Sequence, residues 1–306
     1  MGNTIEARGL RMSYGNRVVL DGVDLAVGKG ELVALLGPNG AGKTTTIELL
    51  EGFRSPDAGE LSVLGVDPSR GDERWRARIG VVLQSWRDHP RWTVRQLLGH
   101  MGDFFAPFGT AAMPRPIPTD EVIEMVGLAE KAGSQIRSLS GGQRRRLDVA
   151  IGIVGRPEVL FLDEPTAGFD PQARREFHEL IHRLVDFEET TILLTTHDLA
   201  EAEVLADRIA ILDGGRIVAS GSSDELARQV AGASEVSWTQ DGVRHVHSAS
   251  DATAFVRELL ARDGDSVTEL RVREQTLEDT YLAMVARRNE AAAQDGVGAE
   301  EREAAR

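Results

Sequence analysis

A glycine-rich loop between a predicted strand and a predicted helix constrains this chain more than any other stretch. Residues 31–36, of which 32–36 are apolar, predict a buried strand and are followed by Gly37-Pro38-Asn39-Gly40-Ala41-Gly42-Lys43-Thr44-Thr45. The spacing fits the pattern G-x-x-x-x-G-K-[ST], in which backbone amides approach a phosphate chain because glycine has no Cβ. In that pattern the lysine reaches the β- and γ-phosphates and the hydroxyl ligates Mg²⁺. A glycine-rich turn that matches by chance is the alternative, and the preceding strand weighs against it.

A second apolar run, residues 159–162, ends in the acidic pair Asp163 and Glu164. Four consecutive apolar residues predict a strand that is buried on both faces of a parallel sheet. A carboxylate at the exit of such a strand can hold Mg²⁺, and we expect this of Asp163. Glu164 is placed to orient or deprotonate an attacking water. The alternative is a solvated acidic pair, which the phosphate loop upstream makes less attractive.

Two further polar residues follow predicted strands. Gln84 comes after the apolar run 79–83, and His197 comes after residues 190–196. Taken alone, Gln84 is an ordinary loop residue and His197 an ordinary structural histidine. Because parallel strands end at the same edge of a sheet, we expect both to converge on the phosphate loop.

Three other features have two interpretations each. Leu139-Ser140-Gly141-Gly142-Gln143 predicts either a helix start that binds an anion or a plain loop-to-helix junction. The run 144–146, three arginines, is interpreted as a solvated basic helix face. Tyr14 can stack on an adenine base, but its position alone favours a half-buried strand tyrosine.

The formal net charge of −14 makes the chain a poor candidate for non-specific nucleic-acid binding, which depends on Lys and Arg. The absence of cysteine excludes disulfides and thiolate metal sites, and a reducing compartment is the simplest interpretation. No signal peptide is visible, and no stretch approaches the ~18 uninterrupted apolar residues of a membrane-spanning helix. We therefore expect a protein that serves a membrane, if at all, from outside the bilayer.

Alternating strand and helix patterns predict an α/β core, preceded by β structure over residues 3–35. A helical block interrupts the alternation at about residues 92–156. Within it, four prolines predict a loop at residues 106–118, and Thr119 is the expected cap of the next helix.

The length of 306 residues suggests about two domains. We expect the first at residues 1–225 and a small α+β domain at 226–288, ending in a helix at 276–287. Residues 289–306 are Ala- and Glu-rich without an apolar face, so we expect a disordered tail.

Taken together, these motifs resemble the nucleotide-binding subunit of an ABC transporter over about residues 4–225. The resemblance rests on the order and spacing of the Walker A loop (37–45), the Q-loop residue Gln84, the signature (139–143), the Walker B pair Asp163 and Glu164, the D-loop (167–170) and the switch residue His197. It also places Tyr14 at the adenine-stacking position, which reverses the preference stated above. Two departures, Phe169 and Trp92 in place of the usual leucines, can alter the contact between subunits.

Residues 276–282, Thr-Leu-Glu-Asp-Thr-Tyr-Leu, resemble the ending of daunorubicin-resistance-like exporters. This part of the resemblance implies an efflux system with a separate permease. The implied fold is a P-loop NTPase core of the ABC type with an N-terminal antiparallel β subdomain, a helical subdomain and a small C-terminal α+β extension.

The family works as a head-to-tail dimer in which ATP on one phosphate loop is covered by the signature of the other chain. The resemblance therefore implies a homodimer and a separate polytopic membrane permease, without nucleic acid. It implies a peripheral location at the cytoplasmic face of the membrane, with ATP and Mg²⁺ as cofactors.

The resemblance also implies roles for individual residues. Those expected to act in hydrolysis are Glu164, His197, Lys43 and Gln84. Those expected to hold Mg²⁺ are Thr44, Gln84 and Asp163. Those expected to bind ATP are Tyr14, Gly37, Pro38, Asn39, Gly40, Ala41, Gly42, Lys43, Thr44, Thr45, Ser140, Gly141, Gly142 and Gln143.

Three alternatives remain open. An ATPase of this fold outside transport usually carries two cassettes or long coiled-coil inserts, and this chain has neither. A regulatory module without activity is disfavoured by the intact Glu164 and His197. An importer subunit is a closer alternative, and the C-terminal extension is the reason to prefer export.

Overall fold

The computed structural model describes residues 2–82, 89–166, 168–230, 234–240, 242–249 and 251–273. They divide into two compact units, Met1–Ser220 and Gly221–Arg306, each of which is described by itself. Three of the predicted features lie outside the described residues, namely Gln84, the helix at 276–287 and the tail at 289–306.

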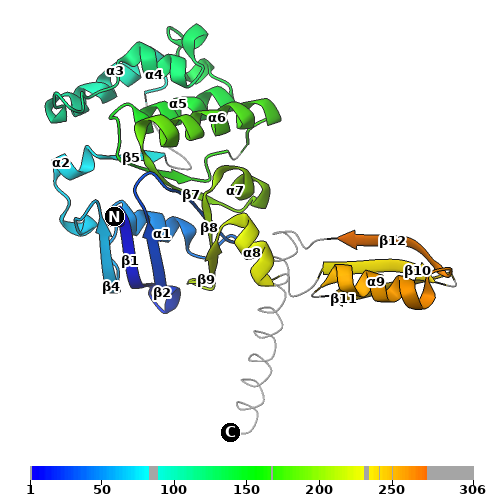
Figure 1. The fold of residues 1–306 in the computed structure, drawn as a ribbon. Coiled ribbons are helices and arrows are strands. Elements are labelled where there is room, and N and C mark those ends of the chain that lie inside the picture. The colour runs from blue at the N-terminus through cyan, green and yellow to red at the C-terminus, as the bar shows by residue number, and fades with distance from the viewer. Residues whose placement is uncertain are drawn as a thin grey trace. The chain divides into compact units, whose positions relative to one another are not determined.

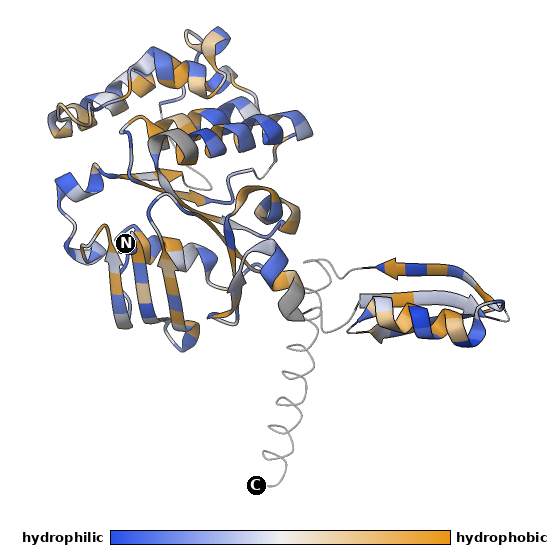
Figure 2. Cartoon of the chain, in the orientation of Figure 1, coloured by the Kyte–Doolittle hydropathy of each residue, from blue (hydrophilic) through white to orange (hydrophobic). Residues whose placement is uncertain are grey.

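A six-stranded sheet forms the centre of the first unit, in the order β5-β6-β7-β3-β8-β9 (Figure 1). Its strands are β3 (Leu32–Leu36), β5 (Ile79–Val82), β6 (Val159–Asp163), β7 (Thr191–Thr196), β8 (Arg208–Asp213) and β9 (Arg216–Gly221). The first five of these pair in parallel. Every residue of β3, β6 and β7 is buried, and the residues of β3 and β6 are mostly hydrophobic (Figure 2). Their carboxyl ends therefore deliver three loops to one edge of the sheet.

A three-stranded antiparallel sheet, ordered β2-β1-β4, forms the N-terminal part of this unit. Its strands are β1 (Ile5–Tyr14), β2 (Arg17–Val27) and β4 (Ala58–Val63). Alternate residues such as Leu10, Leu20 and Val23 are buried in one core cluster together with Phe161 of the central sheet. The two sheets consequently share a core.

Helices lie on the side of the central sheet that faces away from the antiparallel sheet. Of these, α3 and α4 lie farthest from the antiparallel sheet (Figure 1). The helices and single turns of the unit are α1 (Lys43–Leu50), η1 (Pro68–Arg70), α2 (Glu73–Arg76), α3 (Val94–Phe105), η2 (Ala106–Phe108), α4 (Thr119–Met125), η3 (Ala129–Lys131), η4 (Ile136–Ser138), α5 (Gly141–Ile153), α6 (Pro171–Glu188) and α7 (Leu199–Leu205). The prediction that Thr119 caps α4 is wrong, because Pro118 is the N-cap and its carbonyl accepts the amide of Val122. No helix in the described ranges is long and apolar enough to span a bilayer.

One carboxyl group is buried at the end of α1. Glu51 follows the last helical residue, and both of its carboxylate oxygens lack a hydrogen-bond partner within the part of the chain that the structure describes. Burial raises the pKa of Glu51 to about 8, and the negative charges of Asp163 and Glu48 add to the effect. The side chain is therefore mainly protonated at neutral pH.

The second unit is a small α+β fold. It contains α8 (Ser223–Val230), β10 (Ser234–Gln240), β11 (Val243–Ala249), α9 (Ala252–Asp263) and β12 (Val267–Arg273). The antiparallel sheet has the order β11-β10-β12. Val236 and Trp238 of β10 and Leu259 of α9 are buried together, so the helix covers one face of the sheet. β10 and β11, which follow each other in the sequence, pair antiparallel.

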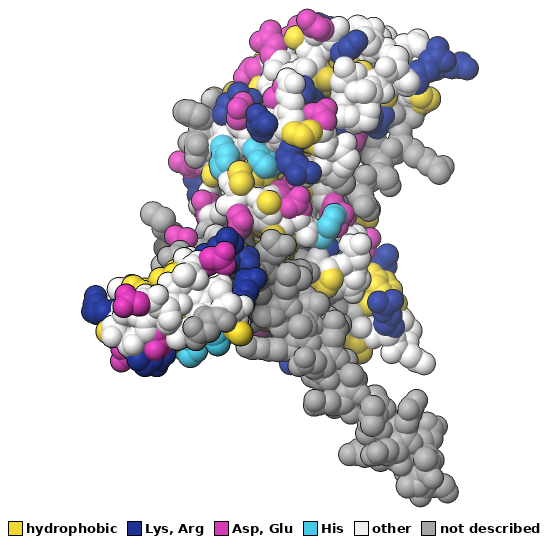
Figure 3. Space-filling model, turned by 90° about the vertical axis from the view of Figure 1, so that its right-hand side faces the viewer, with side chains coloured by type: hydrophobic (Ala, Val, Ile, Leu, Met, Phe, Trp, Pro, Cys, Tyr) yellow, Lys and Arg dark blue, Asp and Glu magenta, His cyan; other side chains and the backbone are white. Residues whose placement is uncertain are grey.

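Charged side chains of both signs are interspersed over the face drawn in Figure 3.

Candidate functional site

The phosphate loop, residues 37–45, joins the carboxyl end of β3 to α1. A Cβ on Gly37 would lie 2.3 Å from the carbonyl oxygen of Leu212, and one on Gly42 would lie 2.6 Å from Cδ2 of Leu20. Gly42 also has a φ of 110°, which L side chains rarely adopt. The backbone conformation therefore requires glycine at Gly42, and packing against a backbone carbonyl requires it at Gly37.

Lys43 is the first residue of α1 and is only 6% exposed. Its Nζ donates to the carbonyl oxygens of Gly37 at 2.8 Å and Pro38 at 3.3 Å. The same nitrogen lies 3.5 Å from Oε1 of Glu164. The loop thus holds an ammonium group beside the first amides of a helix, where anions are favoured.

Two oxygen donors suited to a divalent cation meet between α1 and β6. Thr44 Oγ1 donates to Asp163 Oδ2 at 3.2 Å, and Asp163 Oδ1 accepts from Thr195 Oγ1 at 2.5 Å. A hydroxyl and a carboxylate fit Mg²⁺, which completes its octahedral shell with waters and phosphate oxygens. Within the described ranges, no group of three or more His, Cys, Asp or Glu side chains forms a metal site made of protein ligands only.

Glu164 follows β6 and has a left-handed backbone with φ of 45°. Its amide donates to both the carbonyl oxygen and Oγ1 of Thr195, each at 3.1 Å. The side chain, 15% exposed, places Oε1 3.5 Å from Lys43 Nζ and 3.3 Å from His197 Nδ1. The structure thereby brings together three side chains from the ends of β3, β6 and β7.

A cavity of about 510 Å³ opens over the phosphate loop and Glu164. The lining residues are Tyr14, Arg17, Val19, Asn39, Gly40, Gly42, Lys43, Thr44, Thr45 and Glu164. Tyr14 ends β1, is 40% exposed, and its hydroxyl lies 3.4 Å from Thr45 Oγ1. The guanidinium of Arg54 lies 5.1 Å from the centre of the same ring. Sequence reasoning missed Arg17, which reaches the cavity because β1 and β2 pair Tyr14 with Arg17.

The signature turn, residues 139–143, starts α5 with a capping box. Ser140 Oγ accepts the amide of Gln143 at 3.3 Å, while Gln143 Oε1 accepts the amide of Ser140 at 3.1 Å. The amides of the two glycines in the turn therefore point out of a fixed helix start. None of the turn's residues is among those that line the cavity over the phosphate loop of the same chain.

The interpretation of residues 144–146 as a solvated basic face is wrong. Arg145 is 7% exposed and donates to the carbonyl oxygens of Pro165, Asp163 and Glu164. Arg144 pairs with Asp148 and is only partly exposed. The spacing of the residues could have indicated this burial, because Arg145 and Val149 lie four residues apart on one buried face of α5.

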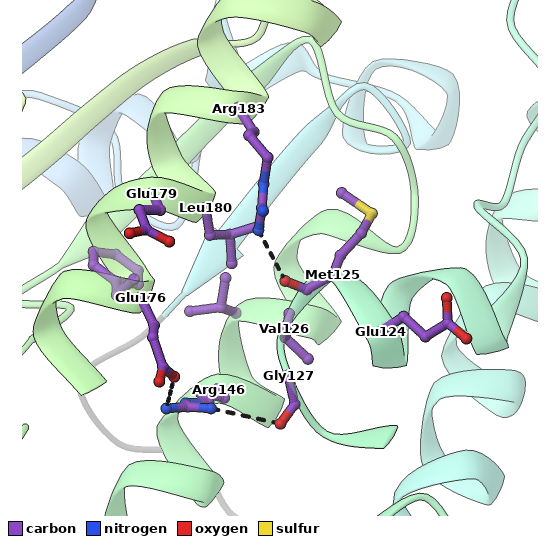
Figure 4. A pocket seen from close by; sticks show the side chains of 11 residues that line it. Glu124, Met125, Val126, Gly127, Arg146, Glu176, Glu179, Leu180 and Arg183 are labelled. Carbon is purple, nitrogen blue, oxygen red and sulfur yellow. Dashed lines mark hydrogen bonds and ion pairs between the residues drawn. The ribbon is translucent and has the colours of Figure 1, made fainter. Parts of the chain in front are cut away.

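Arg146 takes part in a different contact, shown in Figure 4. It pairs with Glu176 of α6 and donates to the carbonyl oxygen of Gly127 at 3.5 Å, while Arg183 donates to that of Met125 at 3.3 Å. These residues line a second cavity, of about 380 Å³, between the end of α4 and helices α5 and α6. Two arginines therefore bind the carbonyl end of α4 to the rest of the unit.

The two departures from the family pattern have local packing partners. Phe169 is 8% exposed and makes an edge contact with Phe177 at 5.9 Å between ring centres. Trp92 stacks on His89 at 4.5 Å and meets the edge of His100 at 5.2 Å. Gln84 and Ala167, by contrast, lie outside the described residues.

The family model described as "ABC transporter" matches residues 20–167. The Nod factor export ATP-binding protein I of Ralstonia nicotianae is 42% identical over 222 residues, which cover 72% of this chain and 68% of the relative. The daunorubicin resistance ATP-binding protein DrrA2 of Streptomyces coeruleorubidus is 36% identical, and the match covers 94% of this chain and 97% of the relative.

Among solved structures, an ATP-binding subunit of an ABC transporter superposes with a TM-score of 0.63 at 29% identity, covering 74% of this chain and 92% of that one. Sequence and fold thus agree with the geometry of the phosphate loop and the acidic pair. The chain belongs to the ABC transporter family of ATP-binding subunits, and it is an ATPase.

Proposed function

We propose that this chain hydrolyses ATP to power the export of a drug-like or natural-product compound through a separate polytopic permease. The placement of Glu164 Oε1 between Lys43 and His197 is the observation that carries hydrolysis at this site. The direction of transport is supported by two relatives that match most of the chain and whose names state daunorubicin resistance and Nod factor export.

Each site residue has a role in this proposal. Lys43 binds the β- and γ-phosphates, and Tyr14 stacks on the base at the other end of the cavity. Thr44 and Asp163 hold Mg²⁺, which neutralises phosphate charge during the reaction. Glu164 accepts the proton of the attacking water, and His197 orients Glu164 and contacts the γ-phosphate.

We propose that the active form is a head-to-tail homodimer. The signature turn is built to bind an anion, yet it does not line the cavity of its own chain. A second copy of the chain supplies the missing side of the site, so that Ser140 and Gly142 face the γ-phosphate bound to the partner. ATP then favours the closed dimer, and hydrolysis releases it.

The permease also has a candidate docking place in the first unit. An apolar groove of about 260 Å³ is lined by Phe53, Val81, Met101 and Phe105 among others. Phe53 is 72% exposed, which is costly for a large apolar side chain that remains in water. We assign this groove to an apolar helix of the permease, which would keep the chain at the cytoplasmic face of the membrane.

Replacing the catalytic carboxylate tests the site and the dimer together. Glu164→Gln should lower phosphate release at least 100-fold while ATP affinity stays within about threefold, because the amide cannot accept the proton. The variant should run as a dimer in gel filtration with ATP, whereas Lys43→Ala should bind no ATP and remain a monomer.

Glu121→Gln, at an exposed position of α4, is the matched control and should behave like the wild type. A monomeric Glu164→Gln variant with full activity would overturn the assignment. For export, cells that express the chain with its permease should accumulate less of a fluorescent anthracycline than cells with Lys43→Ala. Greater accumulation would instead indicate import.

A further inference from the structure

We propose that Arg145 is a positioning residue that links the signature turn to the catalytic carboxylate of the same chain. Through it, ATP held against the turn by a partner chain promotes hydrolysis in this chain's own site. The inference rests on the proposed dimer, and it assigns a role to a residue that is not among those lining the cavity over the phosphate loop.

Besides an ion pair with Asp148 at 3.9 Å, Arg145 contacts the segment that carries Glu164. Nε donates to the carbonyl oxygen of Pro165 at 2.9 Å, and Nη2 donates to those of Asp163 at 2.8 Å and Glu164 at 3.2 Å. One guanidinium therefore bonds three consecutive carbonyl groups. Its planar fork suits this arrangement, which a lysine ammonium or a glutamine amide cannot reproduce.

The segment needs such support because its conformation is unusual. Glu164 has a φ of 45°, in the left-handed region that costs a non-glycine residue about 1–3 kcal/mol. Thr195 holds the amide of Glu164 from one side, while Arg145 holds the carbonyl oxygen from the other. The carboxylate is thereby aimed at Lys43 and His197 rather than left to rotate with a relaxed backbone.

The guanidinium is also buried, at 7% exposure, and burial lowers its pKa. Removing it takes three hydrogen bonds away from the carbonyl groups of this segment, which is costly where they are buried. We therefore expect a small displacement of Arg145 to move the Glu164 segment with it.

Arg145 lies five residues after Ser140 on the same helix, α5. A phosphate that binds the turn pulls on the amides of the helix start, and a hydrogen-bonded helix moves as one body over so short a distance. Any such movement reaches the Glu164 segment directly through the three Arg145 bonds. The signature turn and the catalytic carboxylate of one chain are therefore mechanically coupled, although they serve different ATP molecules.

The first test asks whether Arg145 positions Glu164 or only stabilises the fold. Arg145→Gln should lower kcat for ATP hydrolysis by about 10- to 100-fold, the scale expected for a misplaced catalytic group. ATP affinity should stay within about threefold, because the phosphate loop is untouched. Arg145→Lys should keep more activity than the glutamine variant, since it retains one charged donor. Arg175→Gln, at an exposed position of α6, is the matched control.

A wild-type kcat in Arg145→Lys and Arg145→Gln would overturn the proposal. Equal loss of kcat and ATP affinity in both variants would also overturn it, because that pattern signals a general loss of structure. If Arg145→Gln does not fold, Arg145→Lys alone decides, with an expected loss of about three- to tenfold in kcat at unchanged affinity.

The second test addresses transmission by a double-mutant cycle between Ser140→Ala and Arg145→Lys. Independent residues should have effects on kcat that multiply to within about twofold. If the two residues act through one helix, the kcat of the double variant should be at least threefold higher than the value obtained by multiplying the two single effects. Multiplication of the two effects would overturn the coupling. If the wild-type chain does not dimerise in the presence of ATP, the proposed function itself is refuted.

Discussion

Replacing Glu51 with glutamine offers a quantitative test of the packing around α1. Both carboxylate oxygens are buried without a hydrogen-bond partner among the described residues, and burial raises the pKa of Glu51 to about 8. Glutamine has nearly the shape of the protonated side chain but does not titrate. The variant therefore keeps the packing and removes the dependence on pH.

The sign of the effect follows from proton binding. Below the ordinary pKa of 4.5 the carboxyl group is protonated in the folded and unfolded chains alike, whereas between 4.5 and about 8 the folded chain alone holds the proton. The free energy of unfolding then falls by about 1.4 kcal/mol for each pH unit gained in this window. Between pH 6 and pH 8 the wild type loses about 2.5 kcal/mol that Glu51→Gln does not lose.

Thermal unfolding of the nucleotide-free protein at pH 6, 7 and 8 measures this difference. For a unit of about 200 residues, the gap in Tm between Glu51→Gln and the wild type should widen by roughly 5–10 °C from pH 6 to pH 8. Glu48→Gln, on the same helix but paired with Arg54 at the surface, should show no such widening. A gap for Glu51→Gln that is constant across the three pH values would refute the reasoning.

Two further predictions concern the nucleotide cavity. Gly42→Ala should lower ATP affinity at least tenfold and destabilise the fold by about 1–3 kcal/mol, because its Cβ would lie 2.6 Å from Leu20 at a φ of 110°. Gly133→Ala is the control and should change neither quantity, because its Cβ would meet no atom within 4 Å. Calorimetric titration measures the affinity, and thermal unfolding measures the stability. Tyr14→Ala should weaken ATP binding by about 5- to 100-fold through lost stacking, whereas Tyr14→Phe should stay within about twofold. Equal affinities for the two Tyr14 variants would exclude a stacking role.

The central strands were predictable because burial on both faces leaves a continuous apolar run. Residues 32–36 and 159–162 show this pattern, and β3 and β6 form where it predicts. The convergence of Lys43, Glu164 and His197 follows from the same rule, since parallel strands end at one edge. β2 was harder, because Asp21, Gly22 and Asp24 interrupt its apolar alternation and only pairing with β1 continues the strand.

The roles of residues that depend on partners distant in the sequence could not be predicted from the sequence alone. Arg145 looks like its two neighbours until β6 and the segment after it supply three carbonyl groups. Thr195 is one of several threonines in β7, yet its hydroxyl contacts both Asp163 and the amide of Glu164. Glu51 is an ordinary helix-end glutamate by pattern, and its ionisation is changed by tertiary burial and by the negative charges of Asp163 and Glu48.

The position of β7 between β3 and β6 has a consequence for how the protein is made. The phosphate loop is complete at Thr45, but the strand that orders Asp163 and Glu164 ends at Thr196. Translation at about 5–20 residues per second separates these two points by roughly 8–30 s. Throughout that interval the nascent chain displays a finished nucleotide-binding motif without the strand that aligns its catalytic residues. The contacts of Thr195 with Asp163 and Glu164 therefore form only after β7 has been synthesised.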